Sequence, residues 1–296
     1  MITLLGPILL APLAASPSFP HVQATPAPDQ QIVFEIDGEE AARYHYGPSY
    51  HRPFVFPLIG PAGRPLTRLT HPHDPEGHGH HLSIWVSHRD VNGINFWENG
   101  PARIVHSRIE QLEDGDTACV TAKNAWTDGA GDVLVEERRT LQLHSLPNRE
   151  RYLDITIELS PVAPTVTFGK TPFGFLAVRV AKTMSVNDGG GQIRNSEGGI
   201  NEEAVLWKRA RWVDYTGPVT PTEQNGITFF DHPANPRFPT YFHVRNDGWM
   251  GASFTYESSH ALKEGAKLTL RYRLYAHDGN ATPETIEAHW QRFAKE

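Results

Sequence analysis

The sequence predicts an all-β fold, a large antiparallel β-sandwich that ends in a short C-terminal helix. Segments that alternate apolar and polar residues recur along the chain, as in strands with one buried face. Asn-Gly and Asp-Gly pairs separate these segments, and 24 Pro and 25 Gly in 296 residues suit many short strands joined by turns. A long series of strands with one late helix is typical of a sandwich.

The N-terminal segment is expected to precede the folded domain. Residues Ile2 to Ala15 carry no charge and are largely apolar, and small residues follow, among them Ser16 and Ala24. This pattern is typical of a signal peptide with a cleavage site, followed by a Pro-rich spacer. We assign residues 1–25 to these segments, residues 26–296 to one β-sandwich domain, and the protein to the periplasm or the extracellular space. A disordered or misassigned N-terminus is the alternative.

Two segments show the strand pattern most clearly. In each, one face is apolar, and these side chains are Leu153, Ile155, Ile157 and Leu159 in the first and Leu268, Leu270, Tyr272 and Leu274 in the second. Further strands are predicted in QIVFEI, ACVTAKNAW, DVLVEERRTLQL, ITFFDH, TYFHVR and ASFTYE. Turns are predicted at Asn92-Gly93, Asp114-Gly115, Asp128-Gly129, Asn225-Gly226 and Asp278-Gly279.

The C-terminus is the one segment with a clear helical pattern. Thr282 is a suitable N-cap and Pro283 suits the first helical position. Ile286, Trp290 and Phe293 share one face of such a helix.

Composition argues against several classes of function. A net charge of −7 without basic runs argues against a nucleic-acid or anionic-membrane partner. No apolar stretch of about 20 residues follows the N-terminal segment, so no membrane span is expected in the mature chain. Cys119 is the only cysteine, which excludes an intrachain disulfide, and we expect it to be buried. The oligomeric state is not predicted.

The densest group of polar residues lies between His71 and Asp90, in HPHDPEGHGHHLSIWVSHRD. If the chain is extended from His81 on, two sets of side chains point to opposite faces, His81, Ser83 and Trp85 on one and Leu82, Ile84 and Val86 on the other. The histidines allow three interpretations. They can hydrogen-bond neighbouring strands, act as general acids and bases, or hold a divalent metal through His78, His80 and His81. No standard zinc spacing is present, and no other cofactor is predicted.

Later segments supply further candidate groups. His243 and Arg245 share one face of an extended segment, and Lys170 precedes the apolar segment that carries Arg179. Several aromatic residues can stack on sugar rings or can pack in the core: Trp85, Phe96, Trp97, Tyr241 and Trp249.

The run HGHHLSIWVSHRDVNGINFW, from His78 to Trp97, resembles the signature of a bacterial family of uncharacterised function, labelled PmoA-like or "methane oxygenase PmoA". Supporting similarities are ARYHYG, HRPFVFPLIGPAGRPLTR, FGKTPFGFLAVRVA, WKRARWVDYTGP, ITFFDHPANPRFPTYFHVRNDG and LTLRYRLYAHDG. They extend from Glu35 to Trp290, with one departure at Leu82, where the family is expected to have Arg. Methane oxidation itself is improbable, because a membrane methane monooxygenase subunit needs several apolar spans.

This family is distantly similar to the supersandwich proteins of the galactose-mutarotase-like group. In that group, histidines, an arginine and acidic residues on a concave sheet act on a sugar ring. The resemblance implies a supersandwich-like fold and a carbohydrate or glycoside substrate, on fold-level analogy.

The leading hypothesis is an exported carbohydrate-active enzyme that works by hydrolysis, elimination or epimerisation. His81 and His243 are the expected general acid and base. His88 and Asp90 are expected to hold imidazole tautomers or sugar hydroxyls. Negative charge that develops in the reaction is expected to be stabilised by Lys170, Arg179 and Arg245. Trp85 and Trp97 are expected to stack on the sugar ring. The alternatives are a non-catalytic glycan-binding protein and a metalloenzyme that uses His78, His80 and His81. A glycosidase with paired carboxylates is less favoured, although Glu136, Glu137, Glu202 and Glu203 are available.

Overall fold

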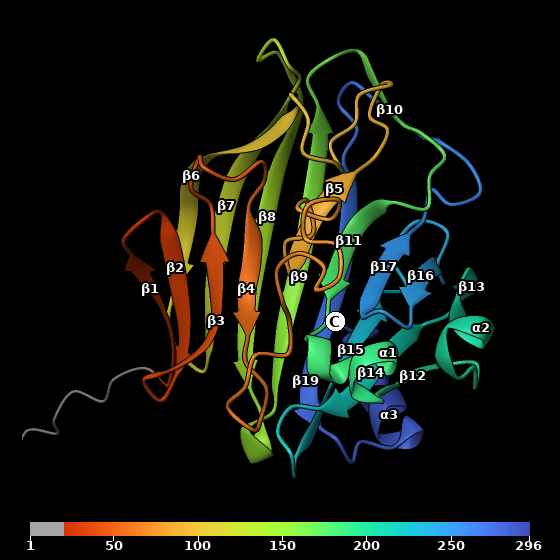
Figure 1. Cartoon of the computed structure of the whole chain (residues 1–296). Helices are drawn as coiled ribbons and strands as arrows, with labels where there is room; N and C mark the ends of the chain where they lie inside the picture. Colours follow the sequence, from red (N-terminus) through yellow and green to blue (C-terminus); the bar gives the residue numbers. More distant parts are fainter. Residues whose placement is uncertain (1–20) are drawn as a thin grey trace, which may run out of the picture.

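Two large antiparallel sheets pack against each other in the computed structural model, which describes residues 21–296 (Figure 1). The nine-stranded sheet has the order β1 (Val22–Ala27), β2 (Gln31–Ile36), β3 (Glu39–His45), β4 (Phe54–Leu58), β5 (Ile84–His88), β11 (Gly174–Arg179), β17 (Trp249–Ser253), β16 (Tyr241–Arg245) and β13 (Lys208–Arg209). This arrangement confirms the predicted all-β sandwich.

The eight-stranded sheet has the order β12 (Gln192–Asn195), β14 (Trp212–Pro218), β15 (Gln224–Asp231), β19 (Leu268–Asp278), β9 (Arg151–Pro161), β8 (Val133–Ser145), β7 (Thr117–Thr127) and β6 (Arg103–Glu113). A separate pair joins β10 (Thr165–Phe168) and β18 (His260–Lys263). The helices are α1 (Val186–Gly189), α2 (Asn201–Val205) and α3 (Pro283–Phe293), with single 3₁₀ turns at Pro147–Arg149 and Lys182–Met184. Within the described chain, no helix is long and apolar enough to cross a bilayer.

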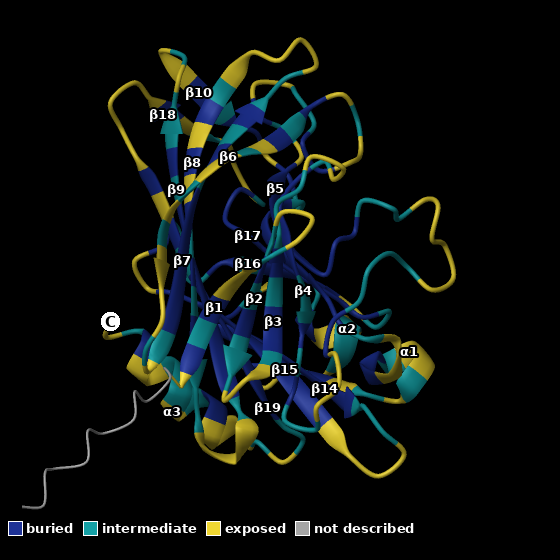
Figure 2. Cartoon of the chain, turned by 90° about the vertical axis from the view of Figure 1, so that its left-hand side faces the viewer, coloured by how far each residue is buried: buried dark blue, intermediate teal, exposed yellow. Residues whose placement is uncertain are grey.

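The main hydrophobic core lies between the two sheets. The predicted apolar faces of β9 and β19 both belong to it, and so do Ile84 and Val86 of β5. Figure 2 shows that buried residues are concentrated in the strands and exposed ones in the loops and at the ends of strands. Each sheet also carries a smaller buried cluster apart from this core. On the eight-stranded sheet, α3 covers such a cluster with Ile286 and Phe293, and its N-cap Thr282 accepts a hydrogen bond from the Thr285 N–H, as predicted. Cys119 is buried, as expected.

Three local predictions need correction. The spacer predicted to reach Thr25 overlaps β1, which begins at Val22 and pairs with β2; the signal peptide itself falls on residues 1–20, outside the described residues. Strand β17 begins before the predicted ASFTYE segment and ends within it. Asn225-Gly226 is not a turn but lies inside β15, where a Cβ at Gly226 would stand 2.1 Å from Cε1 of His277 on the neighbouring strand. Glycine is needed there for a close approach and not for a turn.

Candidate functional site

A pocket lies on the face of the nine-stranded sheet that points away from the main core. Across neighbouring strands, Trp85 of β5 stands opposite Ala177 of β11, Ala177 opposite Gly251 of β17, and Gly251 opposite His243 of β16. These positions share one face because strand side chains alternate. The middle of the row has almost no side-chain volume, and the Trp249 ring lies over it, with Cζ2 3.0 Å from the place of a Cβ on Gly251.

The loop between β4 and β5 brings the histidine cluster to this face. Its end at Ser83 has a positive φ of 63°, which interrupts the strand alternation before β5 begins. Leu82 therefore packs in the same outer cluster as Trp85, and the prediction that these two residues occupy opposite faces was wrong. Ring contacts place His81 over both Trp85 and Trp249, at centroid distances of 5.3 and 5.1 Å.

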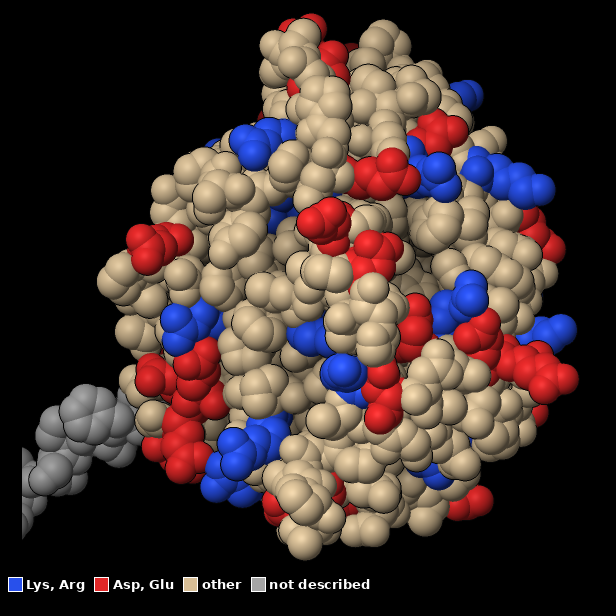
Figure 3. Space-filling view, in the orientation of Figure 1, with Lys and Arg blue, Asp and Glu red and all other residues tan. Residues whose placement is uncertain are grey.

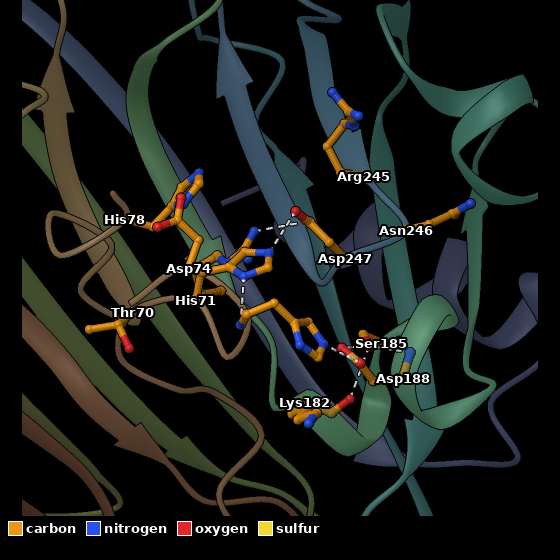
Figure 4. A network of polar contacts seen from close by, with 12 residues as sticks. Thr70, His71, Asp74, His78, Lys182, Ser185, Asp188, Arg245, Asn246 and Asp247 are labelled. Atoms are coloured by element: carbon orange, nitrogen blue, oxygen red, sulfur yellow. Dashed lines mark hydrogen bonds and ion pairs between the residues drawn. The ribbon is translucent and has the colours of Figure 1, made fainter. Parts of the chain in front are cut away.

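Histidine–carboxylate pairs hold this loop in place (Figure 4). His71 Nε2 lies 3.2 Å from Asp247 Oδ2, beyond the end of β16, and His73 Nε2 lies 2.6 Å from Asp188 Oδ1 in α1. Within the loop, His78 Nδ1 lies 2.8 Å from Asp74 Oδ2. The loop is thus attached to segments more than 100 residues away, which positions His78, His80 and His81 at the pocket.

The pocket has a volume of about 410 Å³, within the usual range for small-molecule sites. Seven of the predicted residues line it, namely His78, His80, His81, Trp97, Arg179, His243 and Arg245. The remaining lining residues are Arg89, Glu98, Phe173, Asp247 and Trp249. Residues far apart in the sequence thus contribute charged, imidazole and aromatic groups to one cavity.

His81 and His243 both contact Trp249, with ring centroids 5.1 and 5.7 Å from it. They are 7% and 8% exposed, and Nδ1 of each is buried without a hydrogen-bond partner among residues 21–296. Burial, reinforced by nearby arginines, lowers the pKa of His243 to about 3 and holds the pKa of His81 still further below its ordinary value. Both imidazoles are therefore uncharged at neutral pH in the free protein.

Arg179 and Asp247 form the ion pair at the pocket. Arg179 Nη1 donates to Asp247 Oδ1 at 3.0 Å, and their side chains are 1% and 35% exposed. Burial raises the pKa of the Asp247 carboxyl, but Arg179 and His71 outweigh this effect and hold the pKa below its usual value. Arg179 Nε and Nη2 are buried and have no partner in the described part of the chain.

Charges at the rim are paired. Arg245 Nε lies 2.6 Å from Glu202 Oε1 of α2, and Arg89 Nη2 lies 3.8 Å from Glu98 Oε1. Basic and acidic side chains are interspersed over this side of the molecule (Figure 3). The rim therefore carries little excess charge of either sign.

The other predicted site residues do not line the pocket. His88 is fully buried against Phe168 and Phe175, where its Nε2 lies 3.0 Å from the Thr255 hydroxyl and its Nδ1 accepts from the Asp90 N–H. This placement corrects the expected catalytic position, because His88 faces the core side of β5.

Three residues that were predicted to contact the substrate also do not line the pocket. Trp85 is fully buried and lies under His81 and Trp249, so it supports the pocket floor and offers no free ring face. The Asp90 carboxylate accepts from the Gly93 N–H and stabilises the Asn92-Gly93 turn. Lys170 is exposed and lines a different hollow, together with Thr171, Pro172, Tyr256 and Glu257.

Some lining residues had no assigned role in the sequence prediction. Asp247 follows His243 and Arg245 at the same spacing of two residues, so the alternation of strand side chains could have predicted that it lies on the same face. Trp249 was named there only as one of several aromatics. Arg89 and Glu98 had no comparable signal, because the path of the loops around β5 decides their position.

The imidazole rings of the proposed metal ligands lie close together but do not form a metal site. Ring centroids are 4.4 Å apart for His80 and His81, 4.8 Å for His78 and His81, and 6.0 Å for His78 and His80. Over residues 21–296, no three His, Cys, Asp or Glu side chains are placed to hold one ion.

Comparison with known proteins gives a family and a distant likeness. No curated protein matches the sequence. One similar solved structure is described as "Putative kojibiose phosphorylase from human microbiome", with 10% identity, a TM-score of 0.40, and coverage of 94% of this chain and 37% of that chain. Another is a heparinase III, the BT4657 gene product with methylated lysines, with 10% identity, a TM-score of 0.37, and coverage of 88% and 36%. The chain thus spans well under half the length of either protein. A family model matches residues 31–291, and the chain therefore belongs to DUF6807, a family of unknown function.

Proposed function

We propose that this chain is a carbohydrate-active enzyme that binds a sugar in the pocket over β5, β11, β17 and β16. One observation carries the proposal. Two uncharged, nearly buried imidazoles and a buried guanidinium meet at one open cavity; in the described chain each imidazole has one buried nitrogen without a partner, and the guanidinium has two. Buried polar atoms are almost always hydrogen-bonded, so several unpaired ones around one cavity favour a polar ligand.

The chemistry of the lining groups suits a hydroxylated ring. A neutral imidazole can accept a hydroxyl proton, a guanidinium donates in a planar fork, and the Asp247 carboxylate accepts. Apolar edges of Trp97, Phe173 and Trp249 provide contacts for the C–H surface of such a ring. This mixture of a few polar groups with aromatic walls is common in small-molecule sites.

In the proposed reaction, His81 or His243 acts as a general base. An uncharged imidazole can remove a proton from the sugar, and Arg179 can stabilise the negative charge that develops on a nearby oxygen. The arrangement suits reactions that begin with proton removal, such as elimination or epimerisation. Neither imidazole is protonated to the imidazolium cation at neutral pH in the free protein, so a role as general acid requires uptake of a second proton on binding.

A non-catalytic glycan-binding protein is the second candidate, and one observation favours it. Efficient acid–base catalysts have pKa values near the working pH. Burial instead lowers the pKa of His80 to about 4 and that of His243 to about 3. A protein that only binds sugars has no need for imidazoles that titrate near neutrality.

The test is a screen of the purified full chain against sugars and glycosides, with products detected by mass spectrometry. We expect His243→Ala to lower turnover by roughly 100-fold or more while the urea midpoint stays near that of the parent. The matched control is His21→Ala, which removes an exposed imidazole next to β1, at the opposite edge of the same sheet. Turnover undiminished in His243→Ala contradicts the catalytic role, and saturable binding without product supports the second candidate.

Export to the periplasm or the extracellular space is part of the proposal. It rests on the apolar N-terminal segment of the sequence, together with the small residues that follow it. The resemblance to the PmoA-like family stays a prediction. Sequencing the N-terminus of the protein recovered from the periplasm or the medium tests export, and an intact Met1 in cytoplasmic protein alone contradicts it.

A further inference from the structure

Three arginines place positive charge at or beside the pocket, since Arg179 lines it and Arg52 and Arg68 donate to the backbone of the lining residues His80 and Asp247. Arg52 and Arg179 are each 1% exposed, and Arg68 is partly buried. They come from separate parts of the nine-stranded sheet and its loops, and they surround the histidine loop that forms one wall of the pocket. Such buried guanidinium groups stay charged and need compensation from nearby oxygen atoms.

The compensation for two of these arginines is unusual because it contains no carboxylate. Arg52 donates to the backbone oxygens of His80 and Glu98, both at 3.0 Å, and to the side-chain oxygen of Asn99. Arg68 donates to the backbone oxygens of Thr70, Val180 and Asp247. Backbone dipoles satisfy the hydrogen bonds of these groups but do not neutralise their charge.

Asp247 is the one carboxylate that the described chain places in an ion pair with any of the three, and its partner is Arg179. The arginines at the rim do not change this balance, because Arg245 and Arg89 are accompanied by Glu202 and Glu98. Three buried or partly buried cations are thus accompanied by one ion-paired carboxylate, with Asp188 adding a further attraction on Arg68, and the pocket is the open space next to them.

We propose that the sugar taken by this pocket carries a negatively charged group, a carboxylate or a sulfate or phosphate ester, that binds beside Arg179. This inference rests on the proposed function and names its substrate class. Of the three buried arginines, Arg179 is the one that lines the cavity, and its Nε and Nη2 are without partners in residues 21–296. A guanidinium binds carboxylate and ester oxygens through two parallel hydrogen bonds, which gives both affinity and orientation.

Electrostatics at the neighbouring groups supports the same ligand. Burial lowers the pKa of both Arg52 and Arg68 to about 10; for Arg68 the charge of Arg179 adds to this effect, and Asp247 and Asp188 oppose it. The positive potential of Arg179 also contributes to the lowered pKa of His80 and His81, although burial is the larger cause. A bound anion counteracts each of these effects, and in a low-dielectric pocket its attraction to the cations exceeds that in water.

The experiment is isothermal titration calorimetry on the full chain with matched pairs of sugars. Glucuronate and galacturonate are compared with glucose and galactose, and glucose 6-phosphate and glucose 6-sulfate form a second arm that distinguishes esters from carboxylates. We expect at least one acidic sugar to bind about tenfold or more tightly than its neutral parent. Arg179→Gln is expected to weaken that binding about 30-fold or more, the effect of losing one partner of a buried charge pair.

Two further variants keep the result interpretable. Arg179→Lys retains the cation but loses the planar fork, so we expect it to keep the preference for acidic sugars at lower affinity, even if Arg179→Gln does not fold. Arg108→Gln, which removes an exposed arginine on β6, is the matched control and should bind as the parent does. Equal binding of acidic and neutral sugars overturns the inference and leaves the proposed function standing. Binding of neutral sugars alone has the same meaning, and binding of neither class contradicts both.

Discussion

Asp247→Asn is the substitution that tests most directly how the pocket is held together. The Asp247 carboxylate accepts from Arg179 through Oδ1 and lies 3.2 Å from His71 through Oδ2, so it joins the sheet to the histidine loop. The substitution removes the charge that compensates Arg179 but keeps one oxygen acceptor. The backbone oxygen of Asp247, which accepts a hydrogen bond from Arg68, is unaffected by the substitution.

The magnitude follows from the burial of the two partners. Breaking a fully buried ion pair costs about 3–5 kcal/mol. Asp247 is 35% exposed, and asparagine can still accept one hydrogen bond from Arg179, so we expect a loss of about 1–3 kcal/mol in the free energy of unfolding. The pKa of Asp247 is lowered on folding, so its contribution is present above the unfolded pKa near 3.9 and is lost as pH falls through the folded pKa.

Urea unfolding of parent and variant at pH 7 and at pH 3 measures this effect. The difference between the two proteins should be largest at pH 7 and should shrink at pH 3. Glu136→Gln is the matched control, since it removes one carboxylate from an exposed pair with Lys123 and should leave the urea midpoint unchanged. Parent-like stability of Asp247→Asn at pH 7, or a loss that is the same at both pH values, would refute the reasoning.

Three other sites give independent predictions. Burial raises the pKa of Asp231 to about 7, above its unfolded value, so stability should fall as pH rises from about 4 to 7. Urea unfolding of Asp231→Asn should lack this fall. Burial lowers the pKa of His277, but the effect of Asp214 is larger, and the pKa is raised overall. The pair with Asp214 therefore stabilises the fold fully below pH about 6.5, and this contribution is lost as pH rises through the folded pKa of His277. His277→Ala should cost about 3 kcal/mol in urea unfolding at pH 6. Gly251→Ala places a Cβ 3.0 Å from Cζ2 of Trp249, so calorimetry should show sugar binding weakened several-fold at a stability cost of about 1 kcal/mol.

The strands of the sandwich were predictable because their inner faces obey one simple rule. Alternation placed Leu153 to Leu159 of β9 and Leu268 to Leu274 of β19 in the core, and the structure agrees. The outer faces were less predictable. Tyr152 and Tyr275 lie on the opposite faces of these strands, which alternation assigns to solvent, yet they pack in the cluster that α3 covers, and only the tertiary arrangement determines that.

The site was predictable in part for the same reason. Period-two alternation correctly placed His243 and Arg245 on one face, and the density of histidines indicated the loop that forms a wall. His88 and Trp85 were misplaced because the sequence does not show which histidine or tryptophan of a strand is covered. The positive φ at Ser83 changes the phase of the pattern just before β5, and no residue type there announces it.

The two proposals depend on each other through the proton balance of the pocket. In the free protein, burial is the main cause of the low pKa of His243, with Arg245 and Arg179 lowering it further and Asp247 opposing them. A ligand anion beside Arg179 adds a negative charge to this set and therefore raises the pKa of the imidazole. The imidazole, which acts as a base in its neutral form in the free protein, is then able to take up a second proton and become imidazolium in the complex. An acidic substrate thus makes the imidazolium form available, which a general acid needs, whereas a neutral sugar leaves both imidazoles uncharged and able to act as bases only.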